Sequence, residues 1–418
     1  MSSIKRVETR KGSSADLRVR ADRVAGSLTR SLAKLVASLT QGSGKPSALV
    51  ERAKLDKSLA SRVVRGLRTP PDASALAELP SPKGLRKVLE SARKSAPREL
   101  LAELERDIQA YESFAAEFSG GRPEMLAVVS DWLPDARASA ERTARQRLHT
   151  AWADVAGKRE AARLLAIAIA PSAAGDTCDR LAVSMIRGLR RLRGSAPMTL
   201  TGVDTRGPLG QVRSLDGRPA AEVPRALAVE AFCSPMTEKL RVLDDGRQLT
   251  LYLPGGEPPI NTPVDLAFAR LSLGAWRRRA TAQQPEEFEN SRVRFPVGRY
   301  VSDLLLHEDV GTPEPPVIST SLTGLAPPRG PRDAVENEVQ RIDLHVEIEK
   351  LPPLDASLSQ LRADEAPSYP DLVRYALHKA GWEASRFRAY RISLEYPTPF
   401  VWYSWWVPLP EESAAREP

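Results

Sequence analysis

Basic side chains gather in residues 46–70, where lysine and arginine could contact nucleic-acid phosphates and base edges. The segment LVERAKLDKSLASRVVRGLRTP begins at Leu49 and predicts a helix over Pro46–Ala53, a turn, and a second helix over Lys57–Arg65. Gly66 is expected to end the second helix. Most of the charge of this segment is therefore predicted to lie on the second of two helices joined by a tight turn.

The amino-terminal end of such a second helix points into the major groove when a helix pair of this kind binds DNA. Lys57, Ser58 and Arg62 are accordingly expected to reach base edges, where Lys or Arg contacts guanine O6 and N7. An exposed Leu59 is expected to touch a thymine methyl group. The expected phosphate contacts come from Ser61, Arg65 and Arg68, and from Ser47 at the start of the first helix.

The apolar spacing around these residues resembles the helix-turn-helix of the Cro/C1 (Xre-like) repressor family. The matching positions are Leu49, Ala53, Leu55, Ala60 and Val63, with Gly66 and Pro70 at the exit. The resemblance covers about residues 16–94 and implies a five-helix domain that binds duplex DNA. Lys54 stands where the family's turn has glycine, and Val50 stands where alanine is usual. Lys54 must then accept a left-handed or distorted turn conformation at some cost.

Three further helices complete this expected domain, residues 16–96. The first starts at Asp16 and carries apolar side chains at helical spacing: Leu17, Val24, Leu28, Leu32, Leu35 and Leu39. Asp72–Leu79 is expected to form the fourth helix. The fifth starts at Ser81 with a capping serine and a first-turn proline. Residues 1–15 are expected to form a flexible basic arm.

Charge is distributed unevenly along the 418 residues. Residues 1–100 carry 22 of the 61 Lys and Arg and 9 of the 53 Asp and Glu, which leaves 39 and 44 for the other 318 residues. A basic segment attached to a slightly acidic body is typical of a nucleic-acid-binding module joined to an effector domain. A solvated basic face on a helical domain is the alternative, and charge alone leaves both open.

The rest of the chain predicts a multidomain α+β protein. Residues 97–178 keep a helical pattern, with an alanine-rich stretch at Ala136–Ala170, and are expected to form a linker or dimerisation region. Residues 179–410 are proline-rich and predict a mainly antiparallel α+β effector or assembly domain, followed by a disordered tail at 411–418. The strands expected there are Met198–Val203, Gln248–Leu253, Arg292–Pro296, Tyr300–Leu306, Asp343–Ile348, Phe387–Tyr396 and Phe400–Val407, with one helix at Tyr369–Ala380.

Signatures of catalysis or metal binding are sparse. Asp343, His345 and Glu347 alternate along one predicted strand and suit a metal ion, but a polar strand face in water is the simpler interpretation. The sequence contains no phosphate-binding loop, nucleophile elbow or H-E-x-x-H motif, so no catalytic residue, cofactor or metal ligand is assigned. Cys178 and Cys233 are expected to be free thiols in a reducing compartment.

Two other patterns leave alternatives open. The arginine-rich run MIRGLRRLRG at 185–194 is either a second phosphate-contacting patch or a solvated rim. Trp402, Trp405 and Trp406 in the last predicted strand are expected to belong to the core, with a ligand pocket or dimer interface as the alternative.

These features together predict a sequence-specific DNA-binding protein, a transcriptional regulator associated with the nucleoid in a bacterial cytoplasm. Double-stranded DNA is the expected partner and a homodimer the expected assembly, because a single helix-turn-helix buries little surface. An unidentified ligand or protein would act on the C-terminal domain. Two alternatives stay open: a protein- or RNA-interaction module built on the same helices, or an enzyme in residues 200–410 that is tethered to DNA.

Overall fold

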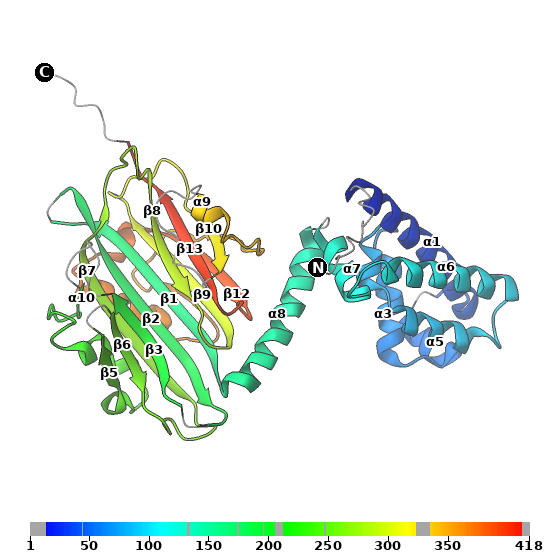
Figure 1. The fold of residues 1–418 in the computed structure, drawn as a ribbon, viewed down its shortest axis with the longest axis horizontal. Coiled ribbons are helices and arrows are strands. Elements are labelled where there is room, and N and C mark those ends of the chain that lie inside the picture. Colours follow the sequence, from blue (N-terminus) through cyan, green and yellow to red (C-terminus); the bar gives the residue numbers. More distant parts are fainter. Residues whose placement is uncertain are drawn as a thin grey trace, which may run out of the picture. The chain divides into compact units, whose positions relative to one another are not determined.

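Helices form the first part of the chain and strands dominate the remainder (Figure 1). The computed structural model describes residues 14–43, 45–131, 134–173, 175–194, 196–204, 212–245, 248–322 and 335–411. The expected arm at 1–15 and tail at 411–418 lie almost wholly outside these ranges. The chain divides into two compact units, Met1–Glu141 and Arg142–Pro418. The predicted α+β class, with helices first and a strand-rich region after them, is confirmed.

The helical unit contains the five helices expected over residues 16–94, followed by two more. Its helices are α1 (Ser14–Thr40), α2 (Pro46–Ala53), α3 (Lys57–Arg68), α4 (Ala75–Glu78), α5 (Pro82–Ala92), α6 (Arg98–Ala116) and α7 (Arg122–Asp131). A longer helix, α8 (Pro134–Ala156), crosses the boundary between the two units.

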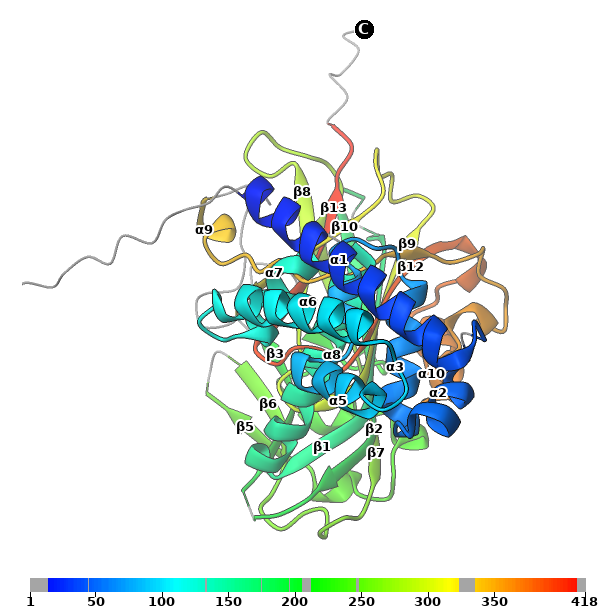
Figure 2. The same ribbon diagram turned by 90° about the vertical axis from the view of Figure 1, so that its right-hand side faces the viewer.

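Helix α1 packs along α6 and supplies much of the core of the helical unit (Figure 2). Leu28, Leu32 and Leu35 of α1 are fully buried, as the helical spacing predicts, and Leu104 and Ile108 of α6 are buried with them. Each fully buried side chain of this kind stabilises the fold by about 1.5–3 kcal/mol relative to an exposed one. The remaining short helices, α2 and α3 among them, are held against this pair.

A seven-stranded sheet organises the second unit (Figure 1). Its strands are β1 (Lys158–Pro171), β2 (Thr177–Arg191), β4 (Val212–Arg213), β7 (Val264–Arg277), β9 (Val297–His307), β11 (Glu349–Lys350) and β12 (Phe387–Glu395). Their order across the sheet is β11-β12-β9-β1-β2-β7-β4. Neighbours are antiparallel except β1 and β9, which run parallel.

Helix α10 (Tyr369–Lys379) covers one face of this sheet and two three-stranded sheets cover the other. One small sheet has the order β10-β13-β8, built from β10 (Val317–Leu322), β13 (Val401–Pro408) and β8 (Glu286–Arg292). The other has the order β3-β6-β5, built from β3 (Met198–Asp204), β6 (Gln248–Leu253) and β5 (Arg241–Asp244). The connections carry short helices: η1 (Pro224–Leu227), η2 (Glu230–Phe232), η3 (Thr237–Lys239), α9 (Val335–Glu338), η4 (Ser359–Leu361) and η5 (Ala384–Arg386).

The expected helix over Ala136–Ala170 is correct only for its first part. Helix α8 ends at Ala156, and strand β1 begins at Lys158. The prediction was wrong here because β1, KREAARLLAIAIAP, is rich in alanine and leucine, which favour helix in isolation. Its central residues are buried on both faces of the sheet, so the alternation typical of a half-buried strand is lost.

Most strands expected after residue 197 are present, as β3, β6, β9, β12 and β13, and so is helix α10. Two expectations are wrong. Arg292–Pro296 begins on the last residue of β8 and then leaves the strand, and Asp343–Ile348 lies outside the strands, directly before β11. Its even-numbered side chains pack against the core of the β10-β13-β8 sheet, which explains the alternation in the sequence.

Candidate nucleic-acid interface on helix α3

The turn between α2 and α3 places a lysine in a left-handed backbone conformation. Lys54 has φ 55° and ψ 30°, as the departure from the family's glycine predicts, and its backbone N–H donates to the carbonyl of Leu49. Leu55 then returns the chain to the core and is 5% exposed. A left-handed turn costs a residue with a side chain about 1–2 kcal/mol. The buried Leu49, Ala53 and Leu55 offset this cost and fix the direction in which α3 departs.

Helix α3 begins with a capping carboxylate that sequence analysis did not single out. Asp56 Oδ1 accepts a hydrogen bond of 2.8 Å from the backbone N–H of Leu59. An Asp at this position satisfies one of the free N–H groups of the first turn and stabilises the helix by about 1 kcal/mol. The Asp-Lys-Ser-Leu order at Asp56 is the signal that could have located the start of the helix.

Gly66 does not end the helix as expected, since α3 continues to Arg68. It is buried instead, at a close approach between α3 and the end of α4. A Cβ at this position would lie 2.6 Å from Cδ2 and 3.1 Å from Cα of Leu79, which is itself fully buried. Glycine is therefore required here by packing, because no larger residue leaves room for Leu79.

The exposed face of α3 is basic. Lys57, Ser58, Ser61, Arg62, Arg65 and Arg68 are all exposed, and the helix contains no Asp or Glu. At 100° per residue these six positions fall within one broad arc of the helix. The structure thus brings six of the eight expected contact residues onto one surface. The core positions, including Ala60 and Val63, lie on the opposite side.

One carboxylate from a neighbouring helix reaches this face. Glu78 of α4 forms an ion pair with Arg65, with Oε2 2.7 Å from Nε. In the part of the chain that the structure describes, no ion pair engages Lys57, Arg62 or Arg68. Three of the four cations of α3 therefore keep their charge available to an external partner.

Two of the expected contact residues, Leu59 and Ser47, do not lie on the exposed basic face of α3. Leu59 is half-buried and packs against the core beside Gly84 of α5, so the expectation that it is exposed is wrong, while its contact with a thymine methyl group stays a prediction. Helix periodicity gives the position of Leu59 on α3, but its burial depends on contact with α5, which comes later in the chain. Ser47 is exposed in the first turn of α2, away from the main arc on α3. The preceding Lys45 makes no side-chain capping bond to that turn.

The acidic helix α6 pairs with one cation of α1 and one of α5. Lys34 of α1 pairs with Glu103 at 2.7 Å, and Arg86 of α5 pairs with Glu112 at 2.6 Å. The two N–O pairs of Arg86 and Glu112 form a fork, which lowers the pKa of Glu112. Other exposed cations, Arg23 of α1 and Lys87 of α5 among them, make no ion pair within the described residues, so what distinguishes α3 is that its own exposed face carries four cations and no carboxylate.

A buried polar bridge holds the segment against which α3 packs. Arg122 of α7 donates to the hydroxyl of Tyr111 at 2.7 Å and to the carbonyls of Leu76 and Leu79 at 3.2 and 3.1 Å. Burial raises the pKa of Tyr111, and the charges of Arg122 and Arg62 oppose this rise.

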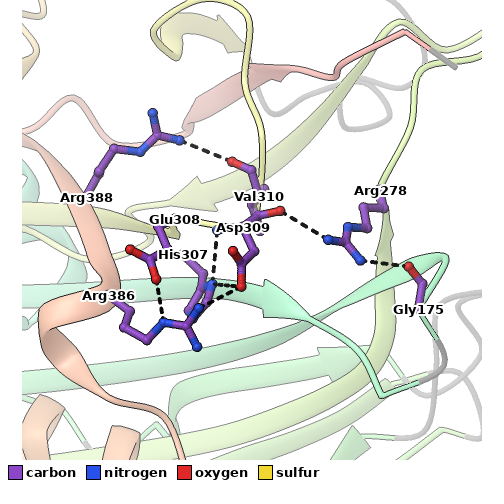
Figure 3. Close-up of polar contacts among 8 residues, drawn as sticks. All are labelled: Gly175, Arg278, His307, Glu308, Asp309, Val310, Arg386 and Arg388. Carbon is purple, nitrogen blue, oxygen red and sulfur yellow. Dashed lines mark hydrogen bonds and ion pairs between the residues drawn. The ribbon is translucent and has the colours of Figure 1, made fainter. Parts of the chain in front are cut away.

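The strand-rich unit contains a charged cluster at the end of β9 (Figure 3). Arg386 pairs with Glu308 at 2.6 Å and with Asp309 at 2.8 Å, while the Asp309 N–H donates to His307 Nδ1 at 3.2 Å. Arg388 donates to the carbonyl of Val310 at 3.1 Å. Each of these contacts closes the turn after β9. The cluster is thus explained by the structure of the turn.

The metal interpretation of Asp343, His345 and Glu347 gains no support from the fold. His345 Nε2 lies 2.9 Å from Glu347 Oε1, and the segment lies outside the named strands. Among the described residues, no three His, Cys, Asp or Glu side chains are close enough together to hold a metal ion.

Both cysteines are free thiols, as expected. Cys178 is fully buried, and burial raises its pKa to about 11. Burial also raises the pKa of Cys233, whose Sγ lies 3.4 Å from the carbonyl of Val229. A thiol kept protonated in this way is a poor nucleophile at neutral pH.

The arginine-rich run at 185–194 follows the second half of β2 and serves the fold. Arg191 is buried and donates to the carbonyls of Ala196 at 2.9 Å and Pro258 at 3.3 Å. Arg187 pairs with Asp265. Trp405 and Trp406 are fully buried, which confirms their expected place in the core, whereas Trp402 is only half-buried and lies under the guanidinium of Arg292.

No known protein family, curated protein or solved structure matches this chain. Within the ranges that the structure describes, every helix is too short or too polar to cross a lipid bilayer.

Proposed function

We propose that this protein binds double-stranded DNA through α3, as a helix-turn-helix of the Cro/C1 (Xre-like) type, and acts as a sequence-specific transcriptional regulator. The observation that carries the proposal is the exposed face of α3, where four cations and two serines stand on a helix without any carboxylate. Cations held on one rigid face suit the phosphates and guanine edges of a major groove.

The packing of α3 supports a reading role for its amino-terminal half. Asp56 caps the helix, Lys54 fixes the turn before it, and Gly66 lets it lie close to Leu79. A helix fixed at both ends presents its side chains in a defined register, which sequence reading requires. Lys57, Ser58 and Arg62 are assigned to base edges, and Ser61, Arg65 and Arg68 to phosphates.

A homodimer is part of the proposal. One α3 reads only a few base pairs, whereas two copies on half-sites one helical turn apart multiply the specificity. The strand-rich unit would then serve assembly or the sensing of a ligand. A regulator of this kind acts where the chromosome is, so we place it at the nucleoid in the cytoplasm.

The test is selection from a pool of random duplexes with the full chain, followed by fluorescence anisotropy on the enriched sequence. Arg62→Ala is expected to weaken binding by about 1–3 kcal/mol, roughly 5- to 150-fold. Because Arg62 is assigned to a base edge, its loss should also relax the preference for the enriched sequence over other duplexes.

Arg106→Ala is the matched control, because Arg106 is an exposed arginine on α6 of the same unit. It should leave affinity and sequence preference unchanged. The proposal fails if no duplex is enriched over background. It also fails if Arg62→Ala and Arg106→Ala behave alike. Binding of single-stranded RNA with equal affinity would favour an RNA-interaction module on the same helices.

A further inference from the structure

A polar cavity of about 350 Å³ lies in the strand-rich unit, between the seven-stranded sheet and the chain segment that follows η4. Two of its nine lining residues, Val301 and Ala363, are apolar. The other seven are polar or charged: Arg299, Arg362, Asp364, Glu365, Arg391, Ser393 and Glu395. Small-molecule pockets span about 300–1,000 Å³, so a cavity of this size and lining suits one small, polar metabolite.

Strands β9 and β12 form the floor of the cavity. Antiparallel pairing sets Arg299 opposite Glu395 and Val301 opposite Ser393. Val301 belongs to the apolar core beneath α10, so these alternate residues all face the α10 side of the sheet. The floor therefore presents a guanidinium beside a carboxylate, and next to them along the strands an apolar side chain beside a hydroxyl.

Arg391 closes one end of the cavity and is anchored by a buried ion pair. Its Nε and Nη2 lie 2.7 and 2.8 Å from the carboxylate oxygens of Asp303, which is fully buried. Nη2 also donates to the carbonyl of Leu361, and Nη1 donates to that of Arg362, both at 2.9 Å. Among the described residues, these four hydrogen bonds leave one of the five guanidinium N–H groups without a partner. Arg391 is 8% exposed, so this N–H is accessible chiefly from inside the cavity.

Residues 362–365 form the wall above the floor and are tied down on two sides. Arg391 holds the first carbonyl of this segment, and Arg187 of β2 donates to the carbonyl of Glu365 at 3.4 Å. The Glu365 carboxylate lies 4.0 Å from Nε of Arg299. A cavity bounded by anchored backbone keeps its shape, which a binding site requires.

Three side chains of the cavity have no partner. Within the part of the chain that the structure describes, the Arg362 guanidinium, the Asp364 carboxylate and the Ser393 hydroxyl make no hydrogen bond or ion pair. Arg362 and Asp364 are exposed, which places them at the mouth, whereas Ser393 is half-buried on the floor. Together with the remaining N–H of Arg391, the cavity thus offers three free donor groups and one free carboxylate.

The end of the cavity at Arg299 is already balanced in charge. Glu395 Oε1 lies 3.5 Å from Nη1 of Arg299, and Glu395 Oε2 lies 2.5 Å from Nη2 of Arg142. Because the contacts of Arg299 with both carboxylates are long, its N–H groups and their oxygens keep capacity for further hydrogen bonds. This end therefore suits a polar group rather than a second full charge.

The mixture of charges selects the class of ligand. The carboxylates of Asp364, Glu365 and Glu395 repel a phosphate dianion, and the guanidinium groups of Arg299 and Arg362 repel a polyamine. An apolar molecule would leave these buried and half-buried groups without hydrogen bonds. A small ligand that carries one anionic and one cationic group satisfies both kinds of partner.

We propose that this cavity binds a free α-amino acid with a polar side chain. Its α-carboxylate accepts hydrogen bonds from Arg362, from the remaining N–H of Arg391 and from the Ser393 hydroxyl. Its α-ammonium donates to Asp364. Its side chain lies towards Arg299, where donors and acceptors stand together. The strand-rich unit is thereby an amino-acid-binding unit, independently of what α3 binds.

A thermal-shift screen of the twenty amino acids against the full chain, followed by isothermal titration calorimetry on the best one, tests the proposal. The best ligand should have a polar side chain. Its α-methyl ester lacks the carboxylate charge, and its N-acetyl derivative lacks the ammonium charge. Each derivative should bind about tenfold to a hundredfold more weakly, the range for a lost charge-assisted hydrogen bond.

Two variants assign the two charged groups of the ligand separately. Arg362→Gln and Asp364→Asn should each weaken binding by about tenfold to a hundredfold. Arg362→Gln should reduce the preference for the amino acid over its methyl ester, and Asp364→Asn the preference over the N-acetyl derivative. Both residues are exposed, so without ligand the two variants should melt at the temperature of the wild type.

Arg374→Gln on α10 is the control, because Arg374 is an exposed arginine of the same unit that does not line the cavity. It should bind the amino acid like the wild type. Arg62→Ala should also leave this binding unchanged, so failure of the α3 proposal and failure of this one are distinguishable.

Four results would overturn the proposal. The first is that no amino acid binds. The second is that an apolar amino acid binds best, or that both derivatives bind as tightly as the parent amino acid. The third is that Arg362→Gln and Asp364→Asn keep the affinity of the Arg374→Gln control. The fourth is tighter binding of inorganic phosphate than of any amino acid, which would make the cavity an anion site.

Discussion

Replacing Gly66 by alanine tests how α3 is held in place. In the interior of a helix, alanine is normally more stable than glycine by about 1 kcal/mol. At this position the added Cβ would lie 2.6 Å from Cδ2, 2.8 Å from Cγ and 3.1 Å from Cα of Leu79. Leu79 is fully buried, and its carbonyl is fixed by Arg122. The clash therefore involves the base of the side chain and the backbone, which cannot rotate away.

Overpacking of a close contact costs about 1–3 kcal/mol. The close contact at Gly66 reaches the backbone of Leu79, so we expect its overpacking cost in the upper part of that range. The higher helix propensity of alanine offsets about 1 kcal/mol of this cost. We expect Gly66→Ala to lower the free energy of unfolding of the helical unit by about 1–2 kcal/mol. The sign is opposite to that of an ordinary Gly→Ala exchange in a helix.

Urea denaturation followed by ellipticity at 222 nm reports mainly on the helical unit. Six of the seven tryptophans lie after residue 141, so tryptophan fluorescence follows the strand-rich unit and should not change. Ser61→Ala, on the exposed face of α3, is the control and should shift stability by less than about 0.5 kcal/mol. A Gly66→Ala variant more stable than the wild type would refute the close packing of α3 on Leu79.

Three other outcomes are expected. Lys54→Gly should raise the free energy of unfolding by about 1 kcal/mol in the same denaturation assay, because glycine adopts a φ of 55° without a side-chain penalty. An unchanged free energy of unfolding would mean that the turn is unstrained. Glu78→Gln frees Arg65 from its ion pair and should tighten duplex binding about two- to fivefold, as measured by fluorescence anisotropy. Weaker binding would contradict a role for Arg65 at phosphates. Burial lowers the pKa of His307, so the unfolded chain takes up this proton more readily and stability falls as the pH drops below about 6.5. His307→Gln should therefore flatten the decline in melting temperature between about pH 7 and pH 5. An equally steep decline in the variant would exclude His307 as its source.

The helices around α3 could be predicted because their signals are local. The apolar spacing of α1 and the helix, turn and helix predicted over residues 46–65 require only neighbours within a few turns. The left-handed conformation of Lys54 was likewise predictable, since it follows from a single departure in a short motif. The burial of Leu59 and the packing role of Gly66 were not, because they depend on Gly84 and Leu79, which belong to later elements.

The strand-rich unit was harder to predict for a related reason. Strand β1 has the composition of a helix, and it becomes a strand because β2 and β9 pair with it on both sides. The nearness of Arg180 on β2 to Arg270 on β7 was not predicted, because their spacing along the chain carries no pattern. Register across the sheet, rather than any motif, brings Arg180 and Arg270 side by side.

The parallel pairing of β1 with β9 has a consequence for synthesis on the ribosome. Glu160 of β1 pairs with Val297 of β9, so one edge of β1 stays without its partner until the later strand has been made. At about 5–20 residues per second the delay is on the order of ten seconds. During that time the hairpin of β1 and β2 presents an apolar, unpaired edge to other nascent chains. Aggregation during overproduction is thus expected to start at this edge, while the helical unit, whose contacts are local, is already complete.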